Sequence, residues 1–149
     1  MSTSLRLSLA TENQTEELGR RLGELLQPGD LVLLNGDLGA GKTVMARGLA
    51  RGLGVSGDYS ITSPTFILLA VYPGRLDFFH ADLYRLSEGE AADLDLLEEA
   101  AGGVLAVEWP ERAGFPWPAE AVRVDLSLGE GLSRNAAVSG PTRVIEGLR

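Results

Sequence analysis

The sequence predicts an α/β protein whose mixed sheet has a parallel core and antiparallel hairpin strands. A nearly continuous apolar run at residues 31–35 (LVLLN) is typical of a strand that is buried on both faces. The glycine-rich stretch 36–43 (GDLGAGKT) follows at once, and a helical pattern comes directly after it. Two later strand-like runs joined by Pro73-Gly74 predict a β-hairpin, which makes the sheet mixed.

The elements of the first half are predicted from hydrophobic periodicity and capping residues. Residues 4–9 alternate polar and apolar, which predicts a short strand. Thr11 then fits an N-cap with Gln14 at capping-box spacing, and Pro28-Gly29 ends that helix. The helix after the glycine-rich stretch is closed by Gly54.

The second half alternates apolar runs with turn residues and carries one acidic segment. The predicted elements are hairpin strands at 66–72 and 75–79, an acidic helix at 88–99, a buried strand at 104–108, a proline-rich loop at 109–118, a strand at 121–128 paired with 133–139, and a terminal helical turn or two within 141–148. No repeat, low-complexity tract or linker is visible, so a single domain over 1–149 is expected.

Composition excludes several classes of protein. The 149 residues are 44% hydrophobic and contain no cysteine, which rules out disulfides and thiolate metal sites. The net charge of −8 disfavours autonomous binding of RNA or DNA, because phosphate contacts dominate that affinity. No signal peptide and no apolar run long enough to span a membrane is visible, so we expect a cytoplasmic protein without membrane contact.

The stretch 36–43 fits the pattern GxxxxGK[ST], and Lys42 is the only lysine in the chain. Glycines let backbone N–H groups wrap around a polyphosphate, and the following helix N-terminus adds to that cradle. In this pattern the lysine reaches the β- and γ-phosphates and the threonine hydroxyl binds Mg²⁺. The sequence therefore predicts a Walker A loop in a P-loop NTPase-type three-layer sandwich. The expected nucleotide-binding residues are Asp37, Leu38, Gly39, Ala40, Gly41, Lys42, Thr43, Val44 and, further along the chain, Thr65.

P-loop enzymes also need an acid at the end of a neighbouring buried strand to hold Mg²⁺. Glu108 ends the strand 104–108, although a surface glutamate there is the simpler alternative. Asp82 is the second candidate, as a metal ligand or as the group that orients the attacking water; its alternative is an N-cap of the turn that follows. The roles of Glu108 and Asp82 can be exchanged. We expect Lys42, Asp82 and Glu108 to be catalytic, and Thr43 and Glu108 to bind the metal.

Four further residues have both a functional and a structural interpretation. Thr65 lies where a switch segment reads the γ-phosphate, or it is a turn residue after a proline. Arg85 meets phosphate, a partner or Asp82. Trp109 packs near the nucleotide or in the core, and a structural use of the lone His80 is at least as common as a catalytic one.

Four separate stretches resemble one family. GDLGAGKT, SPTF, FHADLYRL and VEWPE occur in that order, and the resemblance to the TsaE (YjeE) family runs from Leu5 to about Ile145. The C-terminal third matches only in its alternation. The resemblance implies a small Mg²⁺-dependent ATPase that supports N6-threonylcarbamoyladenosine (t6A) modification of tRNA by the TsaD–TsaB complex. It implies that tRNA is contacted only through these partners, that hydrolysis is weak without them, and that Thr43 and Glu108 form the Mg²⁺ site.

The residues leave three other functions open. A small-molecule kinase would use the same loop, but it needs an acceptor site and an arginine-bearing lid. A GTPase commonly carries an NKxD-type stretch, which a chain with a single lysine at position 42 does not have. A third possibility is that ATP acts as a conformational clamp for partner assembly and that hydrolysis is incidental.

Overall fold

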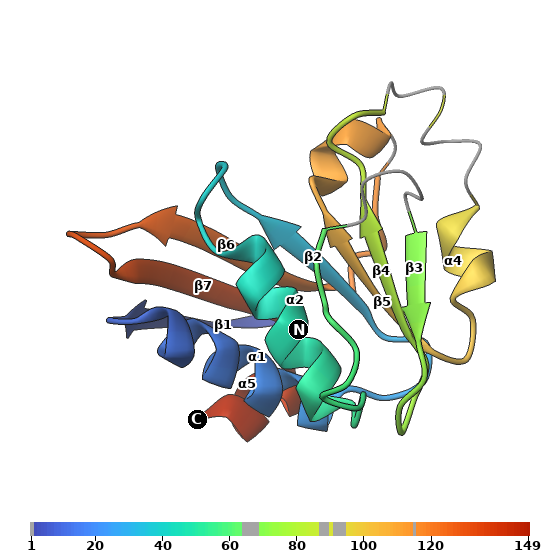
Figure 1. Cartoon of the computed structure of the whole chain (residues 1–149), viewed down its shortest axis with the longest axis horizontal. Helices are drawn as coiled ribbons and strands as arrows, with labels where there is room; N and C mark the ends of the chain where they lie inside the picture. The colour runs from blue at the N-terminus through green and yellow to red at the C-terminus, as the bar shows by residue number, and fades with distance from the viewer. Residues whose placement is uncertain (1, 64–68, 87–89, 91–94, 115) are drawn as a thin grey trace.

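The computed structural model describes residues 2–63, 69–86, 90, 95–114 and 116–149. The described residues form a seven-stranded sheet in the order β1-β7-β6-β2-β5-β4-β3 (Figure 1). Its strands are β1 (Ser2–Leu9), β2 (Leu31–Asn35), β3 (Leu69–Tyr72), β4 (Phe78–Asp82), β5 (Val104–Glu108), β6 (Val122–Leu128) and β7 (Arg134–Pro141). The helices are α1 (Glu12–Leu25), α2 (Lys42–Gly52), α4 (Leu96–Glu99), the 3₁₀ turn η1 (Pro110–Ala113) and α5 (Thr142–Leu148).

The centre of the sheet is parallel and its flanks are antiparallel. Strand β2 pairs in parallel with both β5 and β6, and β5 pairs in parallel with β4. The pairs β3–β4, β6–β7 and β1–β7 are antiparallel. The predicted mixed sheet with a parallel core is therefore confirmed. One consequence is that β2, β4, β5 and β6 all end at the same edge of the sheet.

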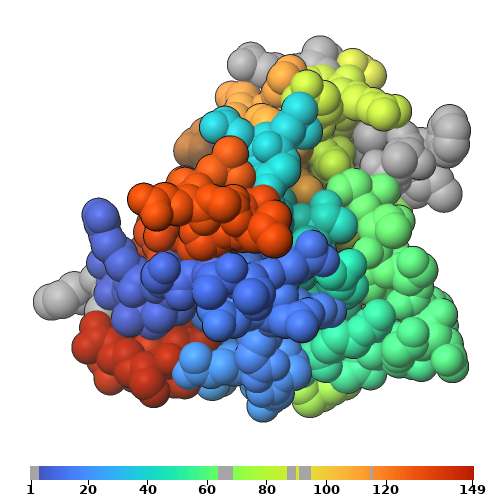
Figure 2. Space-filling view, turned by 60° about the vertical axis from the view of Figure 1, so that its left-hand side comes forward, coloured from blue at the N-terminus to red at the C-terminus, as the bar shows by residue number. Residues whose placement is uncertain are grey.

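Helices cover both faces of the central strands, which gives the predicted three layers. Val32 and Leu34 of β2 belong to the apolar core under α1, α2 and α5. Leu31 and Leu33, which alternate with them, belong to a second core that contains residues of α4 and η1. This alternation explains why the β2 sequence is apolar at nearly every position. Figure 2 shows the first strand and helix lying against β7 and the C-terminal helix α5, so the two ends of the chain pack together.

Helices α1 and α2 touch backbone to backbone through glycines. A Cβ atom added at Gly48 of α2 would lie 2.1 Å from the carbonyl oxygen of Glu16, and one added at Gly19 of α1 would lie 2.5 Å from that of Met45. Gly23 and Gly52 form a second such contact one turn later. No side chain larger than hydrogen fits at these positions without separating the two helices.

The predicted hairpin forms, but its second strand is displaced. Strand β4 begins at Phe78, so the predicted strand 75–79 is wrong by three residues. The Arg75 N–H donates to the Leu53 carbonyl oxygen at 2.6 Å, and the Arg75 guanidinium donates to the Gly23 carbonyl oxygen at 3.0 Å. These contacts hold the segment against the ends of α1 and α2, so the chain joins the sheet only afterwards. Residues 66–68 of the predicted first strand lie outside the described residues.

Two further predictions need correction. A continuous helix over 88–99 is wrong, because Asp95 has a left-handed backbone (φ 38°) and only the turn Leu96–Glu99 follows it; residues 88–89 and 91–94 lie outside the described residues. The loop at 109–118 contains the short turn η1. The terminal helical turns are confirmed as α5. Within the part of the chain that the structure describes, no helix is long and apolar enough to cross a membrane.

Candidate functional site

The glycine-rich loop lies between the end of β2 and the first turn of α2. Gly36, Gly39 and Gly41 all have positive φ, at 151°, 81° and 105°. A Cβ at Gly36 would also lie 2.6 Å from the Leu126 carbonyl oxygen of β6, so this position requires glycine. Gly41 is the N-cap of α2 and provides no side-chain cap, which leaves the first amides of the helix for another acceptor.

Lys42 is the first residue of α2, and it is only 5% exposed. Its ammonium donates to the carbonyl oxygens of Gly36 and Asp37, the latter at 3.2 Å, and lies 3.9 Å from the ring centroid of Trp109. Burial lowers the pKa of Lys42, and the nearby carboxylates of Glu108, Glu111, Asp82 and Asp37 oppose that shift. The only lysine of the chain is therefore held at the loop by backbone carbonyls and an aromatic face.

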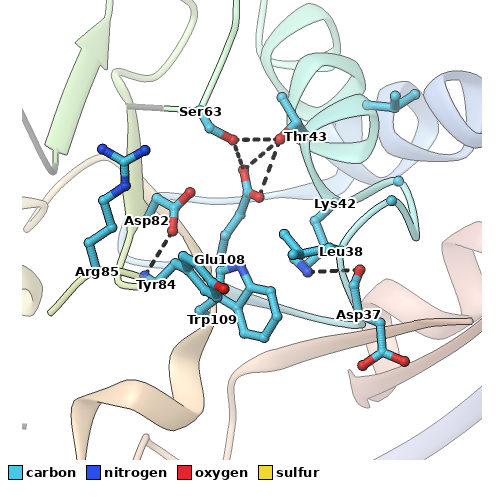
Figure 3. Close-up of a pocket in the computed structure, with 13 residues that line it drawn as sticks. Asp37, Leu38, Lys42, Thr43, Ser63, Asp82, Tyr84, Arg85, Glu108 and Trp109 are labelled. Atoms are coloured by element: carbon cyan, nitrogen blue, oxygen red, sulfur yellow. Dashed lines mark hydrogen bonds between the residues drawn. The ribbon is translucent and has the colours of Figure 1, made fainter. Parts of the chain in front are cut away.

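Thr43, Ser63 and Glu108 form a hydrogen-bonded triangle (Figure 3). The Thr43 and Ser63 hydroxyls are 2.7 Å apart. The Thr43 hydroxyl donates to both carboxylate oxygens of Glu108, at 3.3 and 3.2 Å, and the Ser63 hydroxyl donates to Oε2 at 3.4 Å. Glu108 is the last residue of β5 and is 2% exposed, so it is not the surface glutamate of the simpler alternative.

Asp82 ends β4 directly beside Glu108, its parallel partner in the register. Its Oδ1 accepts a hydrogen bond from the Tyr84 N–H at 2.9 Å, as expected of an aspartate that caps a turn. Burial raises the pKa of the Asp82 carboxyl, the Tyr84 hydrogen bond opposes the shift, and the charge of Glu108 adds to it. The structural role of Asp82 as a cap is therefore visible, and its hydrolytic role stays a prediction.

An aromatic group closes one side of the site. Trp109 has a left-handed backbone (φ 58°), which is uncommon for a residue with a large side chain. Its ring lies 4.8 Å from that of Tyr84, and the Arg112 guanidinium lies 5.2 Å from the Tyr84 ring. This unusual backbone lets a residue directly after β5 turn its indole toward Lys42.

These groups line one cleft of about 460 Å³ at the carboxyl edge of the parallel strands (Figure 3). The residues that line it are Asp37, Leu38, Gly39, Gly41, Lys42, Thr43, Val44, Ser63, Asp82, Tyr84, Arg85, Glu108 and Trp109. Of the predicted site residues, Ala40 is buried in the core instead, and Thr65 lies outside the described residues.

Sequence reasoning missed Ser63 and Tyr84. Ser63 begins the SPTF stretch, but the sequence assigns the role of a switch residue to Thr65, because Thr65 lies between the loop helix and the hairpin. Two residues of SPTF carry a hydroxyl that could contact the loop, and the fold shows that Ser63 contacts Thr43. Tyr84 is in the DLYRL turn, where aromatic residues more commonly serve packing.

A second, smaller cleft of about 170 Å³ lies against the glycine-rich loop. It is lined by Thr11, Glu12, Thr15, Gly39, Gly41, Val44, Leu132 and Arg134. The Arg134 guanidinium donates to the Gly39 carbonyl oxygen at 3.2 and 3.1 Å, which ties β7 to the tip of the loop. Leu132 is 83% exposed at the tip of the β6–β7 hairpin. Gly39, Gly41 and Val44 border both clefts, so the loop separates them.

The donor atoms near Thr43 suit a hard divalent cation. Carboxylate and hydroxyl oxygens are preferred Mg²⁺ ligands, and the Thr43 hydroxyl oxygen lies 3.3 Å from Glu108 Oε1, close enough for both to bind one ion. Among the described residues no three His, Cys, Asp or Glu side chains gather into a metal site. The residues therefore fit an ion that takes its remaining ligands from phosphates and water, as Mg²⁺ does with nucleotides.

The fold and the loop together define the class of protein. A glycine-rich loop joins a buried parallel strand to a helix within a three-layer α/β sandwich, which is the P-loop NTPase type of fold. The sequence model of the TsaE family, described as threonylcarbamoyl adenosine biosynthesis protein TsaE, matches residues 9–136. The chain therefore belongs to the TsaE family of threonylcarbamoyl adenosine biosynthesis proteins.

Individual relatives agree with this assignment. The tRNA threonylcarbamoyladenosine biosynthesis protein TsaE of Streptomyces coelicolor is 53% identical over 100 residues, which is 64% of this chain. The chain spans 66% of that relative, just under two thirds of its length. The protein of the same name from Nostoc sp. is 40% identical over 140 residues, covering 90% of this chain and 85% of the relative. The crystal structure of Bacillus subtilis YdiB matches with a TM-score of 0.80 and 28% identity, over 99% of this chain and 95% of that one.

Proposed function

We propose that this chain binds ATP and Mg²⁺ at the 36–43 loop and hydrolyses the bond between the β- and γ-phosphates. One observation carries the proposal. Lys42 and Thr43 from the loop and Glu108 from the neighbouring parallel strand meet in a single cleft, although Thr43 and Glu108 are 65 positions apart in sequence. Phosphoryl transfer needs little covalent chemistry from a protein and depends on positioning and charge, which this cleft supplies.

The loop binds the phosphates through its backbone and through Lys42. The loop amides and the uncapped first turn of α2 present N–H donors, and these favour anions. Lys42 now donates to two neutral carbonyl oxygens. Phosphate oxygens are stronger acceptors because they are charged, so the ammonium exchanges the carbonyls for the β- and γ-phosphates.

Thr43 and Glu108 hold the metal. When bound, Mg²⁺ neutralises charge that develops on the phosphate oxygens during transfer. The Thr43 hydroxyl supplies a neutral oxygen and Glu108 a charged one from the opposite side of the cleft. The Ser63 hydroxyl contacts both of these side chains.

Asp82 orients the attacking water. Its Oδ1 is fixed by the Tyr84 N–H, which leaves Oδ2 as the acceptor for a water beside the γ-phosphate. Its position next to Glu108 at the end of β4 places it at the same edge as the metal ligands. The proposal also includes Thr65 as a switch residue that responds to the γ-phosphate.

The base of the nucleotide occupies the smaller cleft. The larger cleft contains the metal ligands and Asp82, so the γ-phosphate lies there and the chain of phosphates leaves on the other side of the loop. On that side lies the cleft of about 170 Å³, which is lined by Leu132 and Val44 together with Thr11, Glu12, Thr15 and Arg134. An aromatic base suits such walls.

The cellular role follows from the family. The TsaE relatives are named for tRNA threonylcarbamoyladenosine biosynthesis, and we propose that this chain supports t6A formation by TsaD and TsaB in the cytoplasm. With a net charge of −8 it leaves the binding of tRNA to these partners. Weak turnover in isolation is expected if the partners complete the catalytic geometry.

The test is ATP hydrolysis by the chain alone and then with purified TsaD and TsaB. The control is a Lys42→Ala chain, which should lose most of its ATP affinity in calorimetry. Stimulation by the partners that is lost in the control supports the proposal. Brisk turnover that ignores the partners favours an independent ATPase or kinase. ATP binding without turnover, even with both partners present, favours the clamp function over hydrolysis.

A further inference from the structure

The single histidine of the chain makes a buried contact with the proposed metal ligand. His80 Nε2 lies 2.7 Å from Oε2 of Glu108, and the two side chains are 0% and 3% exposed. His80 is in the middle of β4, and Glu108 ends the adjacent parallel strand β5. His80 does not line the cleft, so it approaches the carboxylate from within the sheet and not from the nucleotide side.

The surroundings of His80 fix the direction of this hydrogen bond. Its other ring nitrogen, Nδ1, is buried and has no hydrogen-bond partner among the described residues. A buried N–H without an acceptor is costly, whereas a bare ring nitrogen loses less. The arrangement therefore favours the tautomer in which Nε2 carries the hydrogen and donates it to the Glu108 carboxylate. The Phe78 ring stacks on the imidazole at 5.9 Å and 19°, which restricts its rotation.

Of the three donors to Glu108 among the described residues, His80 is the one that cannot turn to the nucleotide. Thr43 and Ser63 both face the cleft, and their hydroxyls can rotate to new partners there. The His80 contact is fixed by burial and by the stacked ring. It holds Oε2, so that Oε1, which lies 3.3 Å from the Thr43 hydroxyl, keeps one orientation toward the cleft.

We infer that His80 is a positioning residue that orients the Glu108 carboxylate for the metal–nucleotide complex. This inference rests on the proposed function, since it assigns a role to a residue behind the proposed metal ligand. Partners in this position fix the geometry of a ligand, and their loss typically weakens metal affinity or activity about 10- to 100-fold. His80 makes no contact with the nucleotide in this scheme and acts only through Glu108.

The test compares His80→Gln, His80→Asn and His80→Leu. Glutamine can place an amide N–H where Nε2 lies, asparagine is too short to do so, and leucine has no donor. The readout is the affinity for a non-hydrolysable ATP analogue in Mg²⁺ and in EDTA. The dissociation constant in EDTA divided by that in Mg²⁺ measures how strongly the metal strengthens binding. We expect His80→Asn and His80→Leu to lower this ratio about tenfold or more, and His80→Gln to change it less than threefold.

Thermal unfolding of each variant separates this role from a purely structural one. If His80→Leu does not fold, the comparison of the two amide variants decides. An unchanged ratio in His80→Asn, or equal losses in the asparagine and glutamine variants, overturns the inference. In a Glu108→Gln chain, His80→Asn should have no further effect, and an additional loss shows that His80 does not act through Glu108. An unsubstituted chain that ignores Mg²⁺ instead overturns the proposed function itself, and the inference with it.

Discussion

The ammonium of Lys42 lies 3.9 Å from the centre of the Trp109 ring, and the backbone of Trp109 takes a left-handed conformation in this arrangement. A cation over an indole face is attracted by the ring, and the attraction strengthens where water is excluded. Lys42, which we propose to bind phosphate, is therefore already in contact with the residue directly after Glu108.

Trp109 should report on the position of Lys42. If Lys42 moves to the phosphates, the charge over the indole changes, and the fluorescence of Trp109 changes with it. A Trp117→Phe chain, in which Trp109 is the only tryptophan, should respond to a non-hydrolysable ATP analogue. The matched control, Trp109→Phe, should stay unchanged. The prediction is contradicted if the Trp109 fluorescence does not change at concentrations where calorimetry detects binding.

Nucleotide affinity should fall on the alkaline side. Burial lowers the pKa of Lys42, so the charged form is lost at a lower pH than in an ordinary lysine. Because the ammonium is the form that binds phosphate, affinity decreases as the pH rises through this lowered pKa. Calorimetric titration of the analogue at increasing pH tests this. In a Lys42→Ala chain, whatever affinity remains should show no such decrease.

Replacing Asp82 by asparagine should spare binding and slow turnover. Asparagine keeps an oxygen that accepts from the Tyr84 N–H but loses the charge that we propose orients the attacking water, so we expect about a 100-fold lower kcat. Burial raises the pKa of Asp82, so the carboxylate of the unsubstituted chain is protonated at a higher pH than usual. Turnover should therefore fall as the pH drops through this raised pKa, and the variant should lack that acid limb. Full turnover in the variant removes Asp82 from the chemistry.

An added negative charge in the smaller cleft should weaken the binding of ATP but not the binding of inorganic triphosphate. Leu132→Asp replaces an apolar wall by a carboxylate, and we expect ATP affinity to fall about five- to tenfold. Inorganic triphosphate, which has no base, should bind as before. Leu128→Asp is the matched control, because Leu128 is also exposed on the same hairpin but does not line the cleft. Equal losses for ATP and triphosphate would place the base elsewhere.

The contact between α1 and α2 should not tolerate a methyl group. In Gly48→Ala the new Cβ would meet the Glu16 carbonyl oxygen at 2.1 Å, and a backbone atom cannot turn aside. We expect a loss of about 1–3 kcal/mol in the free energy of unfolding, measured by denaturant titration. Gly57→Ala, where the added atom meets nothing within 4 Å, should change stability little. Equal stability of the two variants contradicts the close contact.

Local patterns in the sequence predicted the parts of this fold that local interactions determine. The apolar runs 31–35 and 104–108 became β2 and β5 with the expected bounds. The displaced β4 shows the limit, because its start depends on the contact between Arg75 and Leu53, which belong to different elements. The pairing of β1 with β7 joins the two ends of the chain, and no local pattern indicates it.

The candidate site divides in the same way. The motif identified Lys42 and Thr43, and a strand end identified Glu108. The contact between His80 and Glu108 depends on the register of β4 against β5 and was not visible beforehand. The SPTF stretch contains two hydroxyl side chains, those of Ser63 and Thr65. The sequence does not show which of them contacts Thr43, and the structure shows that Ser63 does.

The glycine contact between α1 and α2 also limits which walls of the cleft can move relative to one another. Helix α2 begins with Lys42 and Thr43, and α1 brings Thr15 to the other side of the loop. Because the two backbones touch, these helices cannot slide past one another and behave as one rigid block. Under the proposed function, loss of the γ-phosphate would therefore be communicated to a partner through the opposite wall of the cleft. That wall contains Ser63, Asp82 at the end of β4 and Trp109 directly after β5, and none of them is part of the block.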